Sequence, residues 1–229
     1  GMEGRQGRVF REARATGLPR RHLLGAGPEL SEQTVMVVST GDRPPGPPGA
    51  GAGEPPRYYW RSHTYNRYTG SGWASDETEV IAYRAGVPAI TKTEAAGGPS
   101  ATQRVVRQEV RWLGEGGGLA HAAGTLMVAD HDYTVAWRSA EDPFAATIEA
   151  KTYRADSLVP MADEAGLRAD RGSYPTWVRE RYLALPEGVP SRVLALARDL
   201  TATAGTPYDR ARAIETYLRG FPYTLDVPT

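Results

Sequence analysis

Apolar and polar residues alternate through much of the first two thirds of the chain, which is the pattern of half-buried β-strands. It is clearest between Arg104 and Leu113, where apolar and charged side chains occupy opposite faces: Val106, Val110 and Trp112 against Arg107, Glu109 and Arg111. Similar segments occur at Glu32–Thr40, Gly124–Ala129, Tyr133–Arg138 and Ala145–Tyr153. About seven short strands separated by turn residues predict an antiparallel β-sandwich.

The aromatic segment Tyr58–Trp73 predicts a β-hairpin. Its residues up to Tyr68 alternate between two side-chain sets, one containing Tyr59 and Arg61 and the other Tyr58 and Trp60. Gly70 and Gly72 can adopt the positive φ angles of a tight turn, so we expect Trp73 to begin a returning strand that ends near Tyr83.

Two interpretations of the aromatic segment stay open. Its rings can pack in the core and across neighbouring strands, or they can form an exposed surface that stacks on sugar rings or a peptide. The candidate binding residues for the second case are Tyr58, Trp60, Arg61, His63, Tyr65, Tyr68 and Trp73.

The apolar period becomes helical after Ser157. Trp177, Val178 and Tyr182 predict a short helix that begins at Pro175 and ends before Pro186. Two further helices are expected, and they are bounded by Pro190, Gly205, Thr206-Pro207 and Gly220. The fold class is therefore mainly β with C-terminal α: a sandwich followed by two or three helices.

Three regions follow from these patterns: a basic arm over 1–30, a β-sandwich domain over 31–156 and a helical segment over 157–229. The stretch Pro44–Pro56 holds six prolines and four glycines and is expected to be a mobile loop within the second region.

Composition removes several function classes. Lys and Arg total 27 and Asp and Glu total 27, so no net charge favours nucleic acid. The chain has no cysteine, which excludes disulfides, thiolate metal sites and a cysteine nucleophile. No apolar run has the roughly 20 residues that span a bilayer.

Three stretches resemble bacterial membrane-anchored transglutaminase-like proteins: Leu18–Gly25, Tyr59–Trp73 and Tyr208–Leu225. In that family, membrane helices precede an extracytoplasmic region in which a β-rich domain leads into a papain-like core with a Cys-His-Asp triad. The stretch Tyr208–Leu225 resembles the helix and strand just before the catalytic-cysteine helix. No triad position has a counterpart here.

The resemblance therefore implies a non-catalytic extracytoplasmic part of a longer protein that is attached to the membrane only through flanking segments. Its expected partner is the C-terminal transglutaminase-like core of the parent chain, which it would support or supply with substrate. The alternative is a module that binds cell-wall glycan, peptide or another protein through the aromatic segment.

Other chemistry has weaker support. The histidines at 22, 63, 121 and 131 are scattered, and no G-x-S-x-G motif accompanies them. Asp130-His131-Asp132 offers metal-ligand side chains, but residues in a turn point in different directions. Glu109 and Glu149 are acids on predicted strands, and Gly116-Gly117-Gly118 lacks the lysine of a phosphate-binding loop. We expect no catalytic residue, metal or cofactor.

Overall fold

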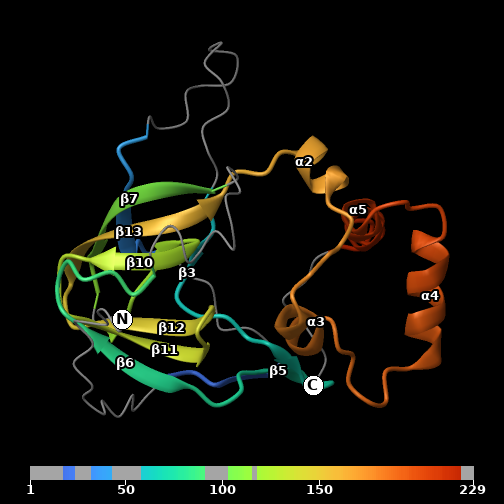
Figure 1. Cartoon of the computed structure of the whole chain (residues 1–229), viewed down its shortest axis with the longest axis horizontal. Helices are drawn as coiled ribbons and strands as arrows, with labels where there is room; N and C mark the ends of the chain where they lie inside the picture. The colour runs from blue at the N-terminus through green and yellow to red at the C-terminus, as the bar shows by residue number, and fades with distance from the viewer. Residues whose placement is uncertain (1–17, 24–31, 43–57, 91–102, 115–117, 223–229) are drawn as a thin grey trace, which may run out of the picture. The chain divides into compact units, whose positions relative to one another are not determined.

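The computed structural model describes residues 18–23, 32–42, 58–90, 103–114 and 118–222, which contain thirteen strands and four helices, labelled as in Figure 1. These residues form two compact units. The sandwich unit comprises 32–42, 58–64, 77–90, 103–114 and 118–161, and the helical unit comprises 19–23, 65–76 and 162–222.

Two four-stranded antiparallel sheets face each other in the sandwich unit (Figure 1). The first has the order β10 (Thr125–Ala129), β13 (Thr152–Pro160), β7 (Gln103–Trp112) and β2 (Met36–Ser39). The second has the order β6 (Glu79–Tyr83), β11 (Tyr133–Ser139), β12 (Asp142–Ile148) and β8 (Gly118–Leu119). A short ladder joins β3 (Trp60–Arg61) to β9 (Ala122–Ala123).

Side chains from both sheets fill one core. Val110 and Tyr153 are paired across β7 and β13, and they pack in a cluster with Val135 and Ile148 of the second sheet. The alternation predicted for β7 is confirmed, since Val106 and Val110 are buried while Arg107 is exposed. The predicted fold class, mainly β and antiparallel with C-terminal helices, is confirmed.

The strand predicted over Ala145–Tyr153 is wrong in its bounds. β12 ends at Ile148, and the chain crosses from the second sheet to the first before β13 begins at Thr152. The connection Glu149-Ala150-Lys151 contains neither glycine nor proline, so the sequence gives no turn signal there.

The aromatic segment forms a smaller hairpin than predicted. β4 (Arg67–Tyr68) and β5 (Gly72–Ala74) pair around Gly70, whose φ is +86° as expected. Gly72 has no positive φ and lies inside β5, which also pairs with β1 (Arg21–Leu23). The returning strand ends at Ala74, and β3 pairs with β9 instead of with β4 or β5.

The helical unit contains α2 (Glu164–Ala169), α3 (Thr176–Tyr182), α4 (Ser191–Thr201) and α5 (Pro207–Leu218). The last three were predicted, with Thr206 capping α5 as expected. The short helix α2, capped by Asp163, was not predicted. Gly205 was expected to close α4 as a left-handed cap, but it has no positive φ, and α4 ends earlier, at Ala202 in the right-handed region. Gly220 lies just after α5, as expected.

Several sequence expectations fall outside the described residues: most of the arm over 1–30, the proline-rich stretch 44–56, Gly116 and Gly117, and the chain after Pro222. The boundaries expected at residues 30 and 156 stay predictions. Within the described ranges, no helix combines the length and the apolar character needed to cross a membrane.

Candidate binding site

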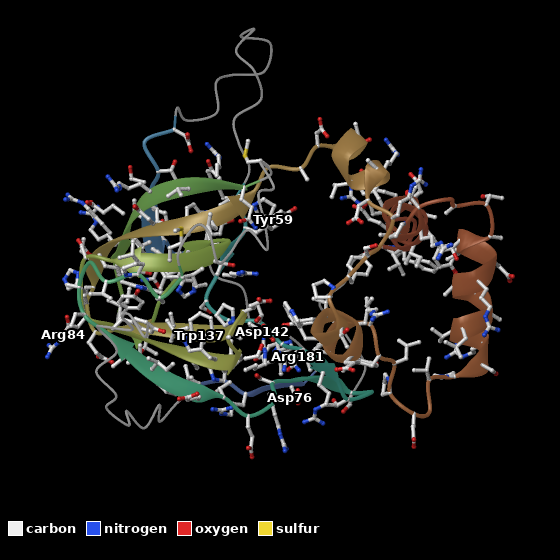
Figure 2. All side chains as sticks on the ribbon, viewed as in Figure 1. Tyr59, Asp76, Arg84, Trp137, Asp142 and Arg181 are labelled. Atoms are coloured by element: carbon white, nitrogen blue, oxygen red, sulfur yellow. The ribbon has the colours of Figure 1, made fainter. Side chains whose placement is uncertain are left out.

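A cavity of about 590 Å³ lies within the helical unit. One wall comes from β4 and the residues beside it, and the other from α3 and the connection that follows it. Polar and charged residues on these walls include Asn66, Arg67, Asp76, Glu180 and Arg181. Figure 2 labels Asp76 and Arg181, which come from the two different walls.

Two reciprocal hydrogen bonds fix the hairpin wall. The Asn66 amide nitrogen donates to Asp76 Oδ2 at 2.6 Å, and the Asp76 backbone N–H donates to Asn66 Oδ1 at 3.1 Å. Asn66 is only 7% exposed, so this pairing also satisfies a buried amide. The link joins the residues just before β4 and just after β5, and it therefore closes the base of the hairpin.

Aromatic and apolar side chains complete the lining. Tyr68 packs against Trp73 with 5.3 Å between ring centroids, and its hydroxyl donates to the Gly70 carbonyl at 2.9 Å. On the other wall, Trp177 lies 6.3 Å from Tyr182 in an edge-on arrangement, and Leu185 and Pro186 follow. The cavity thus offers both flat apolar surfaces and charged groups.

Of the predicted binding residues in the helical unit, only Tyr68 lines this cavity. Trp73 packs behind it, as the partner of Tyr68. Tyr65 stacks on His22 at 6.2 Å and donates to the Pro19 carbonyl at 2.9 Å, and burial raises the pKa of its hydroxyl.

The other four predicted residues belong to the sandwich unit. Tyr58 donates to Asp42 at 2.7 Å and lies 5.8 Å from Trp60. Arg61 donates to the Gly124 carbonyl at 2.8 Å and to Thr125 Oγ1 at 2.7 Å. His63 packs edge-on against Phe144 at 6.1 Å. These contacts hold the segment to other parts of the sandwich unit, and the exposed aromatic surface stays a prediction.

The sandwich unit contains a serine–histidine pair, Ser62 and His63, and a buried carboxylate, Asp142. Ser62 Oγ lies 2.8 Å from His63 Nδ1. Both carboxylate oxygens of Asp142 accept hydrogen bonds from Arg138, at 2.8 and 2.9 Å. Arg138 therefore balances the charge of the Asp142 carboxylate, which is 5% exposed.

The turn Asp130-His131-Asp132 uses its carboxylates to anchor neighbouring chain. Asp130 Oδ1 accepts from the Arg154 backbone N–H, and Asp132 accepts from the Ala85 backbone N–H and the Arg84 guanidinium. The bonds from Ala85 and Arg84 lower the pKa of Asp132. In the part of the chain that the structure describes, no three His, Asp or Glu residues are grouped to hold a metal ion.

Asn66, Asp76, Trp177, Glu180 and Arg181 were not among the predicted site residues. Trp177 was recognised only as part of a helix face. Because the two walls are separated by about a hundred positions in the chain, no local motif connects them. The one available signal was the presence of an Asn and an Asp on either side of the predicted Gly70 turn.

No family model and no curated protein matches the chain. Two solved structures do, and both are of the periplasmic domain of TgpA from Pseudomonas aeruginosa. One match has 19% identity and a TM-score of 0.55 over 93% of this chain; the other, bound to ethylmercury, has 20% identity and a TM-score of 0.49 over 87%. This chain spans 66% and 62% of those chains, respectively. The first match shows that the fold is shared.

Proposed function

We propose that this chain is a non-catalytic, extracytoplasmic module of a transglutaminase-like membrane protein, in which the sandwich unit supports the catalytic core. The resemblance at Leu18–Gly25, Tyr59–Trp73 and Tyr208–Leu225 supports the family. The shared fold with a periplasmic domain supports the location. The absence of cysteine from the chain supports the lack of a nucleophile of the papain-like type.

The observation that carries this proposal is the unequal burial of the two units. The sandwich has its own core, whereas no residue of α2, α3, α4 or α5 is buried. On α4 and around the end of α5, Val193, Leu218 and Phe221 are 45%, 59% and 57% exposed. Exposed apolar faces of this kind mark interaction sites, and covering them contributes about 25 cal/mol per Å².

We infer that the remaining core of the parent protein covers these helices and that attachment to the membrane runs through flanking segments. The sandwich would then act as the base on which the core is built. Its partner in this account is the C-terminal transglutaminase-like core.

Activity assays test the non-catalytic assignment. The chain is expected to show no transamidase, amidase or protease activity under conditions in which the parent protein is active. Turnover by the purified chain alone would contradict the proposal.

Charge substitutions test the supporting role. Val193→Glu and Leu218→Glu are expected to leave the melting temperature of this chain unchanged, because both side chains are exposed in it. In the parent protein, the same changes are expected to lower the yield of folded, active enzyme. If the parent tolerates both, the helices are not covered by the core.

The alternative function, binding of cell-wall glycan or peptide, has one specific observation in its favour, the cavity beside Tyr68. Co-sedimentation with peptidoglycan tests it in general form. No retention would count against glycan binding. The chemistry of the cavity walls supports a narrower function, the binding of a peptide.

A further inference from the structure

We propose that the cavity of the helical unit binds a short peptide through its free amino group and its carboxylate. This inference goes beyond the scaffold role and does not depend on it. It rests on two charged groups on the cavity walls, Glu180 and Arg67, whose charges are unused or only partly used among the described residues, and on the apolar side chains that also line the cavity.

Glu180 provides an unused negative charge. Its side chain is exposed on α3, and in the described parts of the chain its carboxylate makes no hydrogen bond or ion pair. A carboxylate in this setting can accept hydrogen bonds from a ligand ammonium group, and charge-assisted bonds of this type are among the stronger polar contacts.

Arg67 provides a partly used positive charge on the opposite wall. Its one contact with an acid is from Nε to Asp76 Oδ1 at 3.4 Å, which is longer than a good charge-assisted hydrogen bond. Over the described ranges, its two terminal nitrogens make no hydrogen bond. These two nitrogens form the fork that fits a carboxylate.

Asp76 does not compete for the ligand ammonium as strongly as Glu180. One of its oxygens accepts the Asn66 amide and the other faces Arg67. Among the described residues that line the cavity, Glu180 and Arg67 are therefore the anionic and cationic groups that we assign to a zwitterion; Arg181 also lines the cavity and has other interactions.

The remaining lining favours a peptide over a sugar. Tyr68, Trp177 and Leu185 also line the cavity and offer apolar surface for an apolar side chain. The volume of about 590 Å³ lies within the roughly 300–1,000 Å³ of small-ligand pockets. A neutral glycan would form hydrogen bonds through its hydroxyl groups but would gain no charge-assisted contact with Glu180 or Arg67.

The direct test is NMR titration of the ¹⁵N-labelled chain with the tripeptide Ala-Phe-Ala, which carries both free termini and an apolar centre. We expect shifts at the backbone amides of Asn66, Thr69 and Glu180. N-acetylation or C-terminal amidation of the peptide is expected to weaken binding about tenfold each, the effect of one lost charge-assisted contact.

Variants assign each terminus to its partner. Glu180→Gln is expected to weaken Ala-Phe-Ala about tenfold but to leave the N-acetylated peptide unaffected, since that contact is already absent. Arg67→Gln is expected to weaken binding of Ala-Phe-Ala about tenfold but to leave the C-terminally amidated peptide unaffected, since that peptide already lacks the contact with Arg67. Glu187→Gln and Arg192→Gln are matched controls, because they remove exposed charges that do not line the cavity.

Three results would overturn the inference: no shift at the cavity amides, equal affinity for free and blocked peptides, or binding of chitotriose as tightly as Ala-Phe-Ala. The last result would assign the cavity to neutral glycan. Each variant is compared with the unmodified chain by its amide spectrum, so loss of binding through misfolding is recognised. None of these results bears on the scaffold proposal.

Discussion

Single residues inside the sandwich unit show how polar groups are accommodated in its core. The Arg138 side chain is fully buried beside Asp142, with a bidentate contact between them (Figure 2 labels Asp142). Arg138 also donates to the Thr64 carbonyl at 2.7 Å and lies 5.6 Å from the centre of the Phe144 ring. It therefore ties the chain after β3 to the β11–β12 hairpin.

Arg138→Gln is expected to lower the free energy of unfolding by about 3–5 kcal/mol, because it leaves the Asp142 carboxylate buried without its cation. Urea denaturation measures this change. Arg107→Gln is the control, since Arg107 pairs with Asp156 while 79% exposed, and its removal should have a much smaller effect. Equal effects of the two substitutions would show that burial does not govern the Arg138 pair.

The buried hydroxyl of Tyr153 is expected to make the fold less stable at alkaline pH. Burial raises the pKa of this hydroxyl to about 12, and the hydrogen bond that the His121 backbone N–H donates to the hydroxyl oxygen acts in the opposite direction. In the unfolded chain the same group ionises near 10, so between pH 10 and 12 the unfolded state has lost its proton while the folded state retains it. Stability is therefore complete below pH 10 and falls as pH rises towards 12, by at most about 3 kcal/mol.

Unfolding free energies measured from pH 8 to 12 check this expectation. Tyr153→Phe should flatten the profile, although burial of Tyr133, whose pKa is also raised, leaves part of the slope. At pH 8 the same variant should lose about 1–3 kcal/mol, because the His121 N–H and C=O both lose a partner. An unchanged slope in this variant would contradict the assignment.

At the scale of elements, Gly124 sets how closely β10 can approach β13. Its φ is +69°, and a Cβ there would overlap the carbonyl oxygen of Leu158. Gly86 also has a positive φ, of +75°, but open space surrounds the position of its Cβ. Substitutions at these two glycines therefore separate the cost of backbone strain from the cost of close packing.

Gly124→Ala should therefore destabilise the fold by about 2–4 kcal/mol, which combines left-handed strain with displacement of the strand. Gly86→Ala should cost only the strain, about 1 kcal/mol. Thermal denaturation of both variants measures the difference. A similar loss of stability in both would mean that the approach to Leu158 adds nothing.

Elements with a strong local period were the ones that the sequence predicted well. β7 follows its alternation, and α5 begins at the Thr206 cap and Pro207. β11 forms where its alternation predicted a strand, but Ala136 and the Arg138 side chain on its other face are buried as well. The aromatic segment failed because its pairing is distant: β3 pairs with β9, and β5 pairs with β1. Alternation within a segment does not specify which distant strand it joins.

The candidate site was largely hidden in the sequence for a related reason. Tyr68 was predicted because it belongs to an aromatic cluster. Asp76 and Glu180 are ordinary surface residues in sequence, and only the packing of α3 beside β4 in the helical unit brings them to one cavity. The proposed chemistry of that cavity depends on charged groups that have no partner among the described residues, such as the carboxylate of Glu180. A sequence pattern does not show which charged groups lack a partner.

For the whole molecule, the contrast between the two units is the main physical result. The sandwich unit buries large side chains such as Tyr153, Phe144 and Ile148 almost completely. In the other unit, side chains cap the N-termini of α2 and α5, and Glu215 pairs with Arg219 at the end of α5, but none of the four described helices has a buried residue. Isolated helices of about 12 residues are marginal in water, so their stability requires a cover.

Hydrogen exchange tests this claim most directly. In the chain alone, amides of β7, β11 and β13 should exchange only through global unfolding, whereas amides of α4 and α5 should exchange orders of magnitude faster. In the parent protein, α4 and α5 should become as protected as the sandwich. If α4 and α5 in the chain alone already exchange as slowly as β13, the helices need no further core and the scaffold account is contradicted.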